Sequence, residues 1–230
     1  MKKLFLCFVL ILSLLFTGCS LFSFEDSENY AMTIDGEKIS VGEFSVYLYE
    51  QKATFEQTGG TDIWETDFNG TPAADVAKEN AYNSIIYVKT ACKNAGDVGV
   101  SLTDEDKAEA ESLAEETLEK MNADYVASVG LSSEQTAEIM EEIILHQKVM
   151  ESVTKTFLLS EADYSAYIDD YQAENPDDDT PRAYLESSMR EAYIKDKKDE
   201  IYKEQIKSWA EDTVVEKNEA VWAEIDITVL

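Results

Sequence analysis

The chain is poor in the residues that most often carry chemistry or constrain a fold. It has three cysteines, three prolines and a single histidine among 230 residues. Only Cys92 lies outside the N-terminal segment, so no intramolecular disulfide is expected in the rest of the chain. No glycine follows position 130, which argues against a small α/β domain with tight strand connections in that half. No GxSxG, HExxH, CxxC or P-loop motif is present, so we predict no catalytic residue and no cofactor.

Basic residues are also scarce. The chain has 19 lysines and arginines against 48 aspartates and glutamates, which gives a formal net charge of −29. This charge disfavours nucleic acids and anionic lipid headgroups as partners. The acids are densest from Thr103 to Glu142, with 13 acidic and 2 basic residues. Two interpretations follow: an acidic surface that serves solubility, which we favour, or one that attracts basic polypeptides.

The first 18 residues have the pattern of a signal peptide. Two lysines precede an apolar run at 4–16, which is shorter than the roughly 20 residues that span a membrane. Small residues then precede Cys19, and this sequence resembles the lipobox of bacterial lipoproteins, although Phe16 replaces the favoured leucine. The resemblance implies cleavage before Cys19 and lipid attachment to its thiol. The protein would then be extracytoplasmic and anchored to the cell membrane, on the outer face in a single-membrane cell, with 19–29 as a flexible tether.

Both ends of the remaining chain have strand patterns. Residues 31–39 are of extended type on either side of an Asp-Gly pair, which is a strong hairpin signal. Residues 221–229 alternate between apolar and polar, which predicts a final strand. Because a single strand cannot satisfy its backbone hydrogen bonds, we expect these two segments to pair in one small sheet.

The sequence between these ends predicts helices, so the expected fold class is mainly α. Ser40 and Ser160 each precede an acidic residue three positions on, and Thr103 precedes an acidic run, so all three are expected N-caps. The expected ranges are 40–55, 72–95, 104–121, 130–157, 159–175 and 182–213.

Two of these helices have a distinctive pattern. The helix at 130–157 has apolar residues at every third or fourth position, which predicts a seam for a partner helix. His146 lies on this seam and is interpreted as a core or rim residue, just as Cys92 is interpreted as a packed thiol. The helix at 182–213 has three acid-first pairs at i, i+4, which favour a charged helix. These pairs are Glu186–Arg190, Glu191–Lys195 and Asp199–Lys203.

Five short segments mark the predicted elements in chain order: IDGEKIS, VGEF, GVSLTDED, GLSSEQ and LSEADYSAYIDDY. Their order resembles the N-terminal chaperone module of the SurA and PrsA families of extracytoplasmic foldases. The resemblance covers nearly all of 30–230 and implies one SurA-N-like domain that holds unfolded exported chains. In these families a parvulin-type prolyl isomerase domain follows the helix that matches 159–175, and a long helix and a strand then complete the module.

The segment NPDDDTP, at 175–181, stands where that isomerase domain would be inserted. A parvulin domain needs roughly a hundred residues, so the short bridge at 176–181 predicts that the isomerase domain is absent. Pro176 is expected to end one helix, Asp179 or Thr180 to cap the next, and Pro181 to lie in its first turn. The aspartates lack the glycine and spaced oxygens of an EF-hand loop, so we predict no metal site beyond weak calcium binding.

The leading hypothesis is therefore a membrane-anchored holdase that binds unfolded exported polypeptides without isomerase activity. One alternative is a helical adaptor that docks a specific envelope partner, and a second is a prolyl isomerase in the full sense of the PrsA family. The candidates for client contact are large aromatic and methionine side chains, which are equally typical of a core. They are Tyr47, Phe55, Trp64, Phe68, Tyr82, Met140 and Met150.

Overall fold

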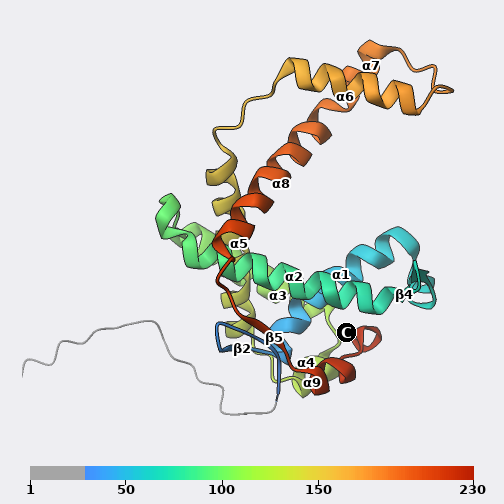
Figure 1. Ribbon diagram of the computed structural model, residues 1–230. Helices are drawn as coiled ribbons and strands as arrows, with labels where there is room; N and C mark the ends of the chain where they lie inside the picture. The colour runs from blue at the N-terminus through green and yellow to red at the C-terminus, as the bar shows by residue number, and fades with distance from the viewer. Residues whose placement is uncertain (1–28) are drawn as a thin grey trace, which may run out of the picture.

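The computed structural model describes residues 29–230, and helices predominate in this part of the chain (Figure 1). The α-helices are α1 (Val41–Gly59), α2 (Ala73–Asn94), α3 (Asp104–Lys120), α4 (Ala123–Ser128), α5 (Ser133–Thr154), α6 (Glu161–Glu174), α7 (Arg182–Ser188), α8 (Arg190–Trp209) and α9 (Glu219–Glu224). The strands are β1 (Tyr30–Ile34), β2 (Glu37–Ser40), β3 (Asp67–Phe68), β4 (Thr71–Pro72) and β5 (Val215–Lys217). Three short 3-10 turns complete the list: η1 (Thr61–Glu65), η2 (Gly96–Val98) and η3 (Ile227–Val229). The predicted mainly α class is confirmed. The predicted signal and Cys19 lie outside the described residues.

A three-stranded antiparallel sheet joins the beginning and the end of the described chain. The strand order is β2-β1-β5, and Asp35 and Gly36 both have positive φ in the turn between β1 and β2. Asp35 also fixes the returning chain, because its N–H donates to the Val214 carbonyl at 2.7 Å and its Oδ1 accepts from the Val214 N–H at 3.0 Å. The expected sheet between the two ends of the domain is therefore present.

The residues that close this sheet differ from those predicted. The third strand is β5, at 215–217, and the predicted strand at 221–229 is wrong. That segment forms α9 and η3 instead, where Trp222 packs edge-on to Phe44, with ring centroids 5.2 Å apart. Apolar residues at 221, 222 and 225 fit one face of a helix as well as they fit an alternating strand. Contacts of Trp222 with Phe44 of α1 and Tyr82 of α2 therefore select the helical form of this segment.

The helices α1, α2, α3 and α5 pack together and share one core with the sheet. This part of the molecule is the body. The helix starts follow the predicted N-caps: the Ser40 Oγ accepts from the Glu43 N–H at 3.0 Å, and Thr103 and Asp106 form a reciprocal capping box. At Ser40 this is the only capping bond, because the Glu43 side chain turns to Lys89 and does not reach back to the cap. The largest fully buried side chains of the body are Tyr47, Phe44, Met32, Ile39, Leu48 and Ile85.

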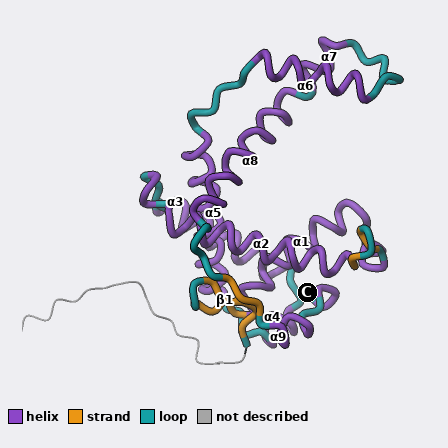
Figure 2. Tube along the Cα trace, viewed as in Figure 1, coloured by secondary structure: helices purple, strands orange, loops and turns teal. Residues whose placement is uncertain are grey.

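A helical arm extends from the body and turns back over one side of it, so that the outline of the molecule is C-shaped (Figure 1). The arm consists of α6, α7 and α8. Its outer end has a small core of its own around four buried side chains: Tyr164, Ile168, Leu185 and Tyr193. At its base, Tyr202 and Ile206 of α8 pack against α2 and α5. A loop leads from α5 in the body to α6 in the arm, and the long helix α8 leads from the arm back to the body (Figure 2).

One predicted helix is shorter than expected and another is divided in the structure. The range 130–157 begins only at α5, because Gly130 has positive φ and Ser132 provides the N-cap for Ser133. The range 182–213 is interrupted at Met189, between α7 and α8. The three predicted acid-first pairs are also replaced: Arg182 pairs with Glu186, Arg190 with Glu161, and Lys195 with Asp199. Two of these replacements are again i, i+4 pairs along a helix, and the third joins Arg190 to a residue of α6.

The segment at 175–181 is a turn between α6 and α7. Asp178 organises it, because its Oδ1 accepts from the Thr180 N–H at 3.0 Å and its Oδ2 accepts from the Tyr171 hydroxyl at 2.9 Å. Pro181 occupies the N-cap position of α7, one residue earlier than predicted, and no side chain caps that helix, so the predicted cap at Asp179 or Thr180 is wrong. These bonds make the segment a structural connection between the two helices.

Candidate functional site

The structure separates the seven predicted client-contact residues into buried and accessible groups. Tyr47 and Met140 are 2% and 4% exposed and belong to the core of the body, so neither presents a surface to a client. Met150 is half-buried at the base of the arm, in a cluster with α8. Tyr82 is half-buried beneath the C-terminal segment. Phe55, Trp64 and Phe68 are the three that come together.

These three side chains form an aromatic cluster at the free end of the body. The rings of Phe55 and Trp64 stack with centroids 5.7 Å apart, and Phe68 lies edge-on to Phe55 at 6.0 Å. The Trp64 Nε1 donates to the Glu56 Oε1 at 2.9 Å, which fixes the indole ring. Phe68 is 45% exposed. The aromatic cluster therefore combines an ordered base with an accessible edge, an arrangement suited to binding apolar side chains.

A short hairpin brings Phe68 to this cluster. It consists of β3 and β4, joined by Asn69 and Gly70, which both have positive φ. The Asp67 Oδ1 accepts from the Gly70 N–H at 2.9 Å and stabilises the turn. No strand was predicted between the helices expected at 40–55 and 72–95, although Asn-Gly between two extended pairs is the strongest short hairpin signal.

Tyr82 lies in a second aromatic site that is already occupied by the chain itself. Its ring is edge-on to Trp222 at 5.8 Å. The Lys217 Nζ lies 4.5 Å from the centroid of Tyr82 and 4.4 Å from that of Trp222, and it forms an ion pair with Glu79. Neither residue was predicted from the sequence: Trp222 lies in the segment 221–229 that was interpreted as a strand, and Lys217 lies before that segment, in β5.

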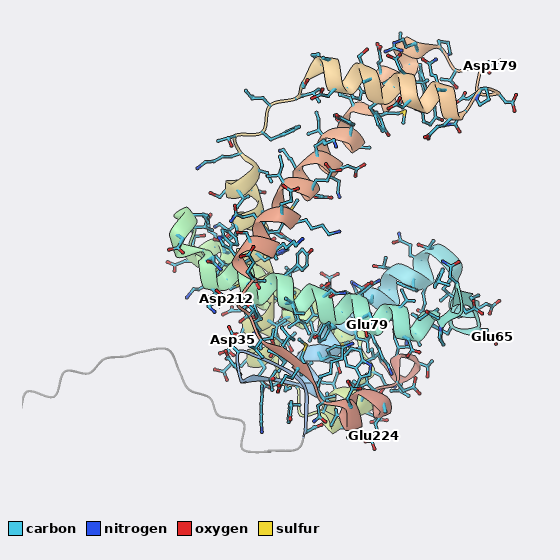
Figure 3. All side chains as sticks on the ribbon, viewed as in Figure 1. Asp35, Glu65, Glu79, Asp179, Asp212 and Glu224 are labelled. Carbon is cyan, nitrogen blue, oxygen red and sulfur yellow. The ribbon has the colours of Figure 1, made fainter. Side chains whose placement is uncertain are left out.

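The outer end of the arm also displays an aromatic side chain. Tyr184 of α7 is 65% exposed, above the small core of the arm. In Figure 3 the side chains of this end and those at the β3–β4 end of the body do not meet across the open side of the C (Figure 3). The two ends are thus separate, and each carries an accessible aromatic ring.

A half-buried polar cluster connects α1, α2 and α5. The Lys89 Nζ lies 2.8 Å from the Glu43 Oε1 and 2.7 Å from the Glu142 Oε2. Burial alone would lower the pKa of Lys89, but the two carboxylates outweigh it and raise that pKa. Burial raises the pKa of Glu142 in spite of Lys89. The Tyr47 hydroxyl is buried beside this cluster without a hydrogen-bond partner, and burial and the nearby carboxylates raise its pKa. This arrangement is structural, because two carboxylates share one ammonium group inside the body.

Neither of the two groups with potential reactivity has the surroundings of a catalytic site. Burial raises the pKa of Cys92 to about 12, and its thiol donates to the Glu142 carbonyl at 3.4 Å. Burial lowers the pKa of His146, whose ring lies 5.4 Å from that of Tyr202 and whose Nε2 is buried without a partner. Between residues 29 and 230 no group of histidine, cysteine and carboxylate side chains is arranged to hold a metal ion. None of the helices in that range is long and apolar enough to cross a membrane.

The chain is similar to known foldases and chaperones. The family model described as the SurA-like N-terminal domain matches residues 2–113. The chain is also similar to the foldase protein PrsA of Caldanaerobacter subterraneus subsp. tengcongensis, with 25% identity over 170 residues. That match covers 71% of this chain and 51% of the relative, so the chain spans about half the length of the curated relative it matches. No solved structure gave a match.

Both matches confirm the resemblance predicted from the sequence. They are consistent with a SurA/PrsA-type module and support a protein of the foldase and chaperone class. The SurA-like match includes β1, β2, α1 and α2, and so it includes the whole aromatic cluster.

Proposed function

We propose that the chain is an extracytoplasmic, lipid-anchored holdase that binds unfolded exported polypeptides and does not catalyse proline isomerisation. The observation that carries this proposal is the accessible aromatic cluster of Phe55, Trp64 and Phe68 at the open side of the C. The similarity to foldases indicates the kind of ligand, because proteins of the foldase class are expected to bind client polypeptides.

The mechanism would be transient burial of apolar client side chains. Covering one large apolar side chain contributes about 1.5–3 kcal/mol, so a single contact at Phe68 would give weak and rapidly reversible binding. A client segment long enough to reach Tyr184 on the arm would gain a second contact, and linked weak contacts raise the overall affinity. The high negative charge of the chain would keep such complexes soluble.

The absence of isomerase activity is proposed from the connection between α6 and α7. The resemblance implies that foldases of this kind carry their catalytic domain at this position. Here Asn175 ends α6 and Arg182 begins α7, and Asp178 ties the turn between them to Tyr171. A domain of ordinary size does not fit into this connection.

The location is proposed from residues outside the described range. Cleavage before Cys19 and attachment of lipid to its thiol would place two or more acyl chains at the new N-terminus, which is enough for stable anchoring. The connecting residues 19–29 would reach at most about 35–40 Å when extended. The binding surface would then work close to the membrane, where exported chains emerge.

An aggregation assay with the soluble fragment 20–230 tests the proposal. The fragment should suppress aggregation of a chemically denatured client in a dose-dependent manner. Phe68→Ala should require several-fold more protein for the same effect. Leu158→Ala, at a site on the α5–α6 loop that is more exposed than Phe68 (87% against 45%), should behave as wild type. No suppression at several-fold excess would contradict the proposal. Capture of one stoichiometric envelope protein, rather than many secreted proteins, would favour an adaptor.

A proline-limited refolding assay tests the second part of the proposal. The fragment should leave the slow, proline-limited phase of a refolding protein unchanged, because this phase is set by uncatalysed isomerisation. A concentration-dependent acceleration would show isomerase activity and would overturn this part.

A further inference from the structure

Three exposed carboxylates lie next to the aromatic cluster in the sequence. Asp62 and Glu65 of η1 and Asp67 of β3 are exposed and adjoin Trp64 and Phe68 along the chain. None of the three belongs to an ion pair among the described residues, although Asp67 accepts the turn hydrogen bond from Gly70. Figure 3 shows Glu65 at the outer end of the body, beside the β3–β4 hairpin (Figure 3).

The basic residues on either side of this region are already engaged. Positions 53–77 contain five acidic residues and no lysine or arginine. The Lys52 Nζ donates to the Leu230 carbonyl at 2.7 Å, and the Lys78 Nζ donates to the Trp222 carbonyl at 3.4 Å. Both lysines therefore fasten the C-terminal segment and do not neutralise the carboxylates at the aromatic cluster.

The chain contains its own example of the ligand that such a surface recognises. Lys217 lies over the rings of Tyr82 and Trp222 and pairs with Glu79. Aromatic faces attract cations through the ring quadrupole, and a neighbouring carboxylate adds a charge-assisted hydrogen bond. The aromatic cluster presents the same combination of rings and carboxylates, but no lysine or arginine of the described chain occupies it.

We propose that the aromatic cluster is a recognition site for extended polypeptide segments in which a lysine or arginine stands next to an aromatic or aliphatic residue. The apolar side chain packs against Phe68 and the rings beneath it, and the cation lies over an aromatic face, paired with Asp62 or Glu65. This inference rests on the proposed client-binding function and specifies which clients are preferred. The source of the preference is local, at one end of the body, and not the net charge of the chain.

Peptide binding by the purified full chain tests the proposal. Three fluorescent peptides share one pattern of aromatic and aliphatic residues and carry lysine, glutamine or glutamate at the intervening positions. Fluorescence anisotropy gives their affinities. The lysine peptide should bind about tenfold more tightly than the glutamate peptide at low ionic strength, and this ratio should shrink as salt screens the exposed charges.

Matched variants locate the preference. Phe68→Ala should weaken the lysine peptide by about fivefold or more, as expected for an anchor residue. The double variant Asp62→Asn, Glu65→Gln should bring the lysine and glutamine peptides to similar affinities. The control Asp177→Asn, Asp179→Asn removes two exposed carboxylates at the far end of the arm, where Figure 3 shows Asp179 (Figure 3), and should leave the lysine preference unchanged.

The possible results separate this inference from the proposed function. If none of the three peptides binds, client binding itself fails. If all three bind with equal affinity, the chain binds clients but the charge preference is overturned. If the arm control lowers the lysine preference as much as Asp62→Asn, Glu65→Gln does, the preference comes from net charge and the local site is overturned.

Discussion

Replacing Lys89 with methionine should destabilise the chain by about 2–4 kcal/mol at neutral pH. Breaking a buried ion pair by removing one partner typically costs 3–5 kcal/mol, because the remaining charge stays buried. Here the side chains of Lys89, Glu43 and Glu142 are 23%, 17% and 32% exposed, and this partial hydration reduces the cost. Two carboxylates would face each other without their shared cation, so the loss should remain well above that of a surface pair.

The pH dependence of this loss has a definite sign. In the native chain the pKa of Lys89 is raised, so its contribution is fully present below the ordinary lysine value and is lost only as the pH rises through the folded value. In the variant, the folded-state pKa of Glu142, already raised by burial, should rise further. Protonation then removes the repulsion, so the deficit should narrow as the pH falls from neutral towards about 5.

Urea denaturation followed by circular dichroism at neutral and mildly acidic pH measures both effects. Lys93→Met is the matched control, because Lys93 also pairs with one carboxylate but is 69% exposed, and a surface pair contributes about 0–1 kcal/mol. Adding Glu43→Gln and Glu142→Gln to Lys89→Met should recover much of the loss. A loss equal to that of Lys93→Met, with no dependence on pH, would refute the reasoning.

Three further predictions concern the C-terminal segment, the thiol and the arm. Ile227→Ala should lower the free energy of unfolding by about 2–5 kcal/mol, because the side chain is 1% exposed. The control Val229→Ala should change the free energy of unfolding little in the same denaturation experiment. Cys92 should resist alkylation at mildly alkaline pH until the chain is unfolded, because its raised pKa leaves almost no thiolate. Rapid alkylation of Cys92 in the native chain would contradict this prediction. Arg182→Ala should increase proteolysis in the arm without lowering the melting temperature of the body, because Arg182 joins α7 to Asp169 and Ser165 of α6; unchanged digestion would contradict this.

Local sequence signals predicted most helix starts but not the final strand. The caps at Ser40, Thr103 and Ser160 depend on one side chain and the next turn of backbone, so a short window of sequence contains the cause. The segment at 221–229 is different, because its pattern fits two structures. Its helix is selected by contacts of Trp222 with Phe44 and Tyr82, which are more than a hundred positions away in the sequence.

The same distinction explains the client-contact predictions. Residue type alone cannot tell which face of α1 or α5 packs inwards, and Tyr47 and Met140 are on the buried faces. Phe55 is only half-buried, beyond Leu48, the last buried residue of α1, and the β3–β4 hairpin folds Phe68 back onto it. The aromatic composition of the site could therefore be predicted, but the selection of three residues out of seven required the tertiary structure.

Site-specific photo-crosslinking tests the central claim most directly. A photoreactive amino acid is placed at position 68, in the aromatic cluster, or at position 158, which is also exposed but lies on the α5–α6 loop. An unfolded client should crosslink strongly at 68 and weakly at 158, and the same client in its folded state should crosslink at neither. Equal crosslinking at both positions, or no crosslinking at 68, would contradict the claim that the aromatic cluster binds unfolded polypeptides.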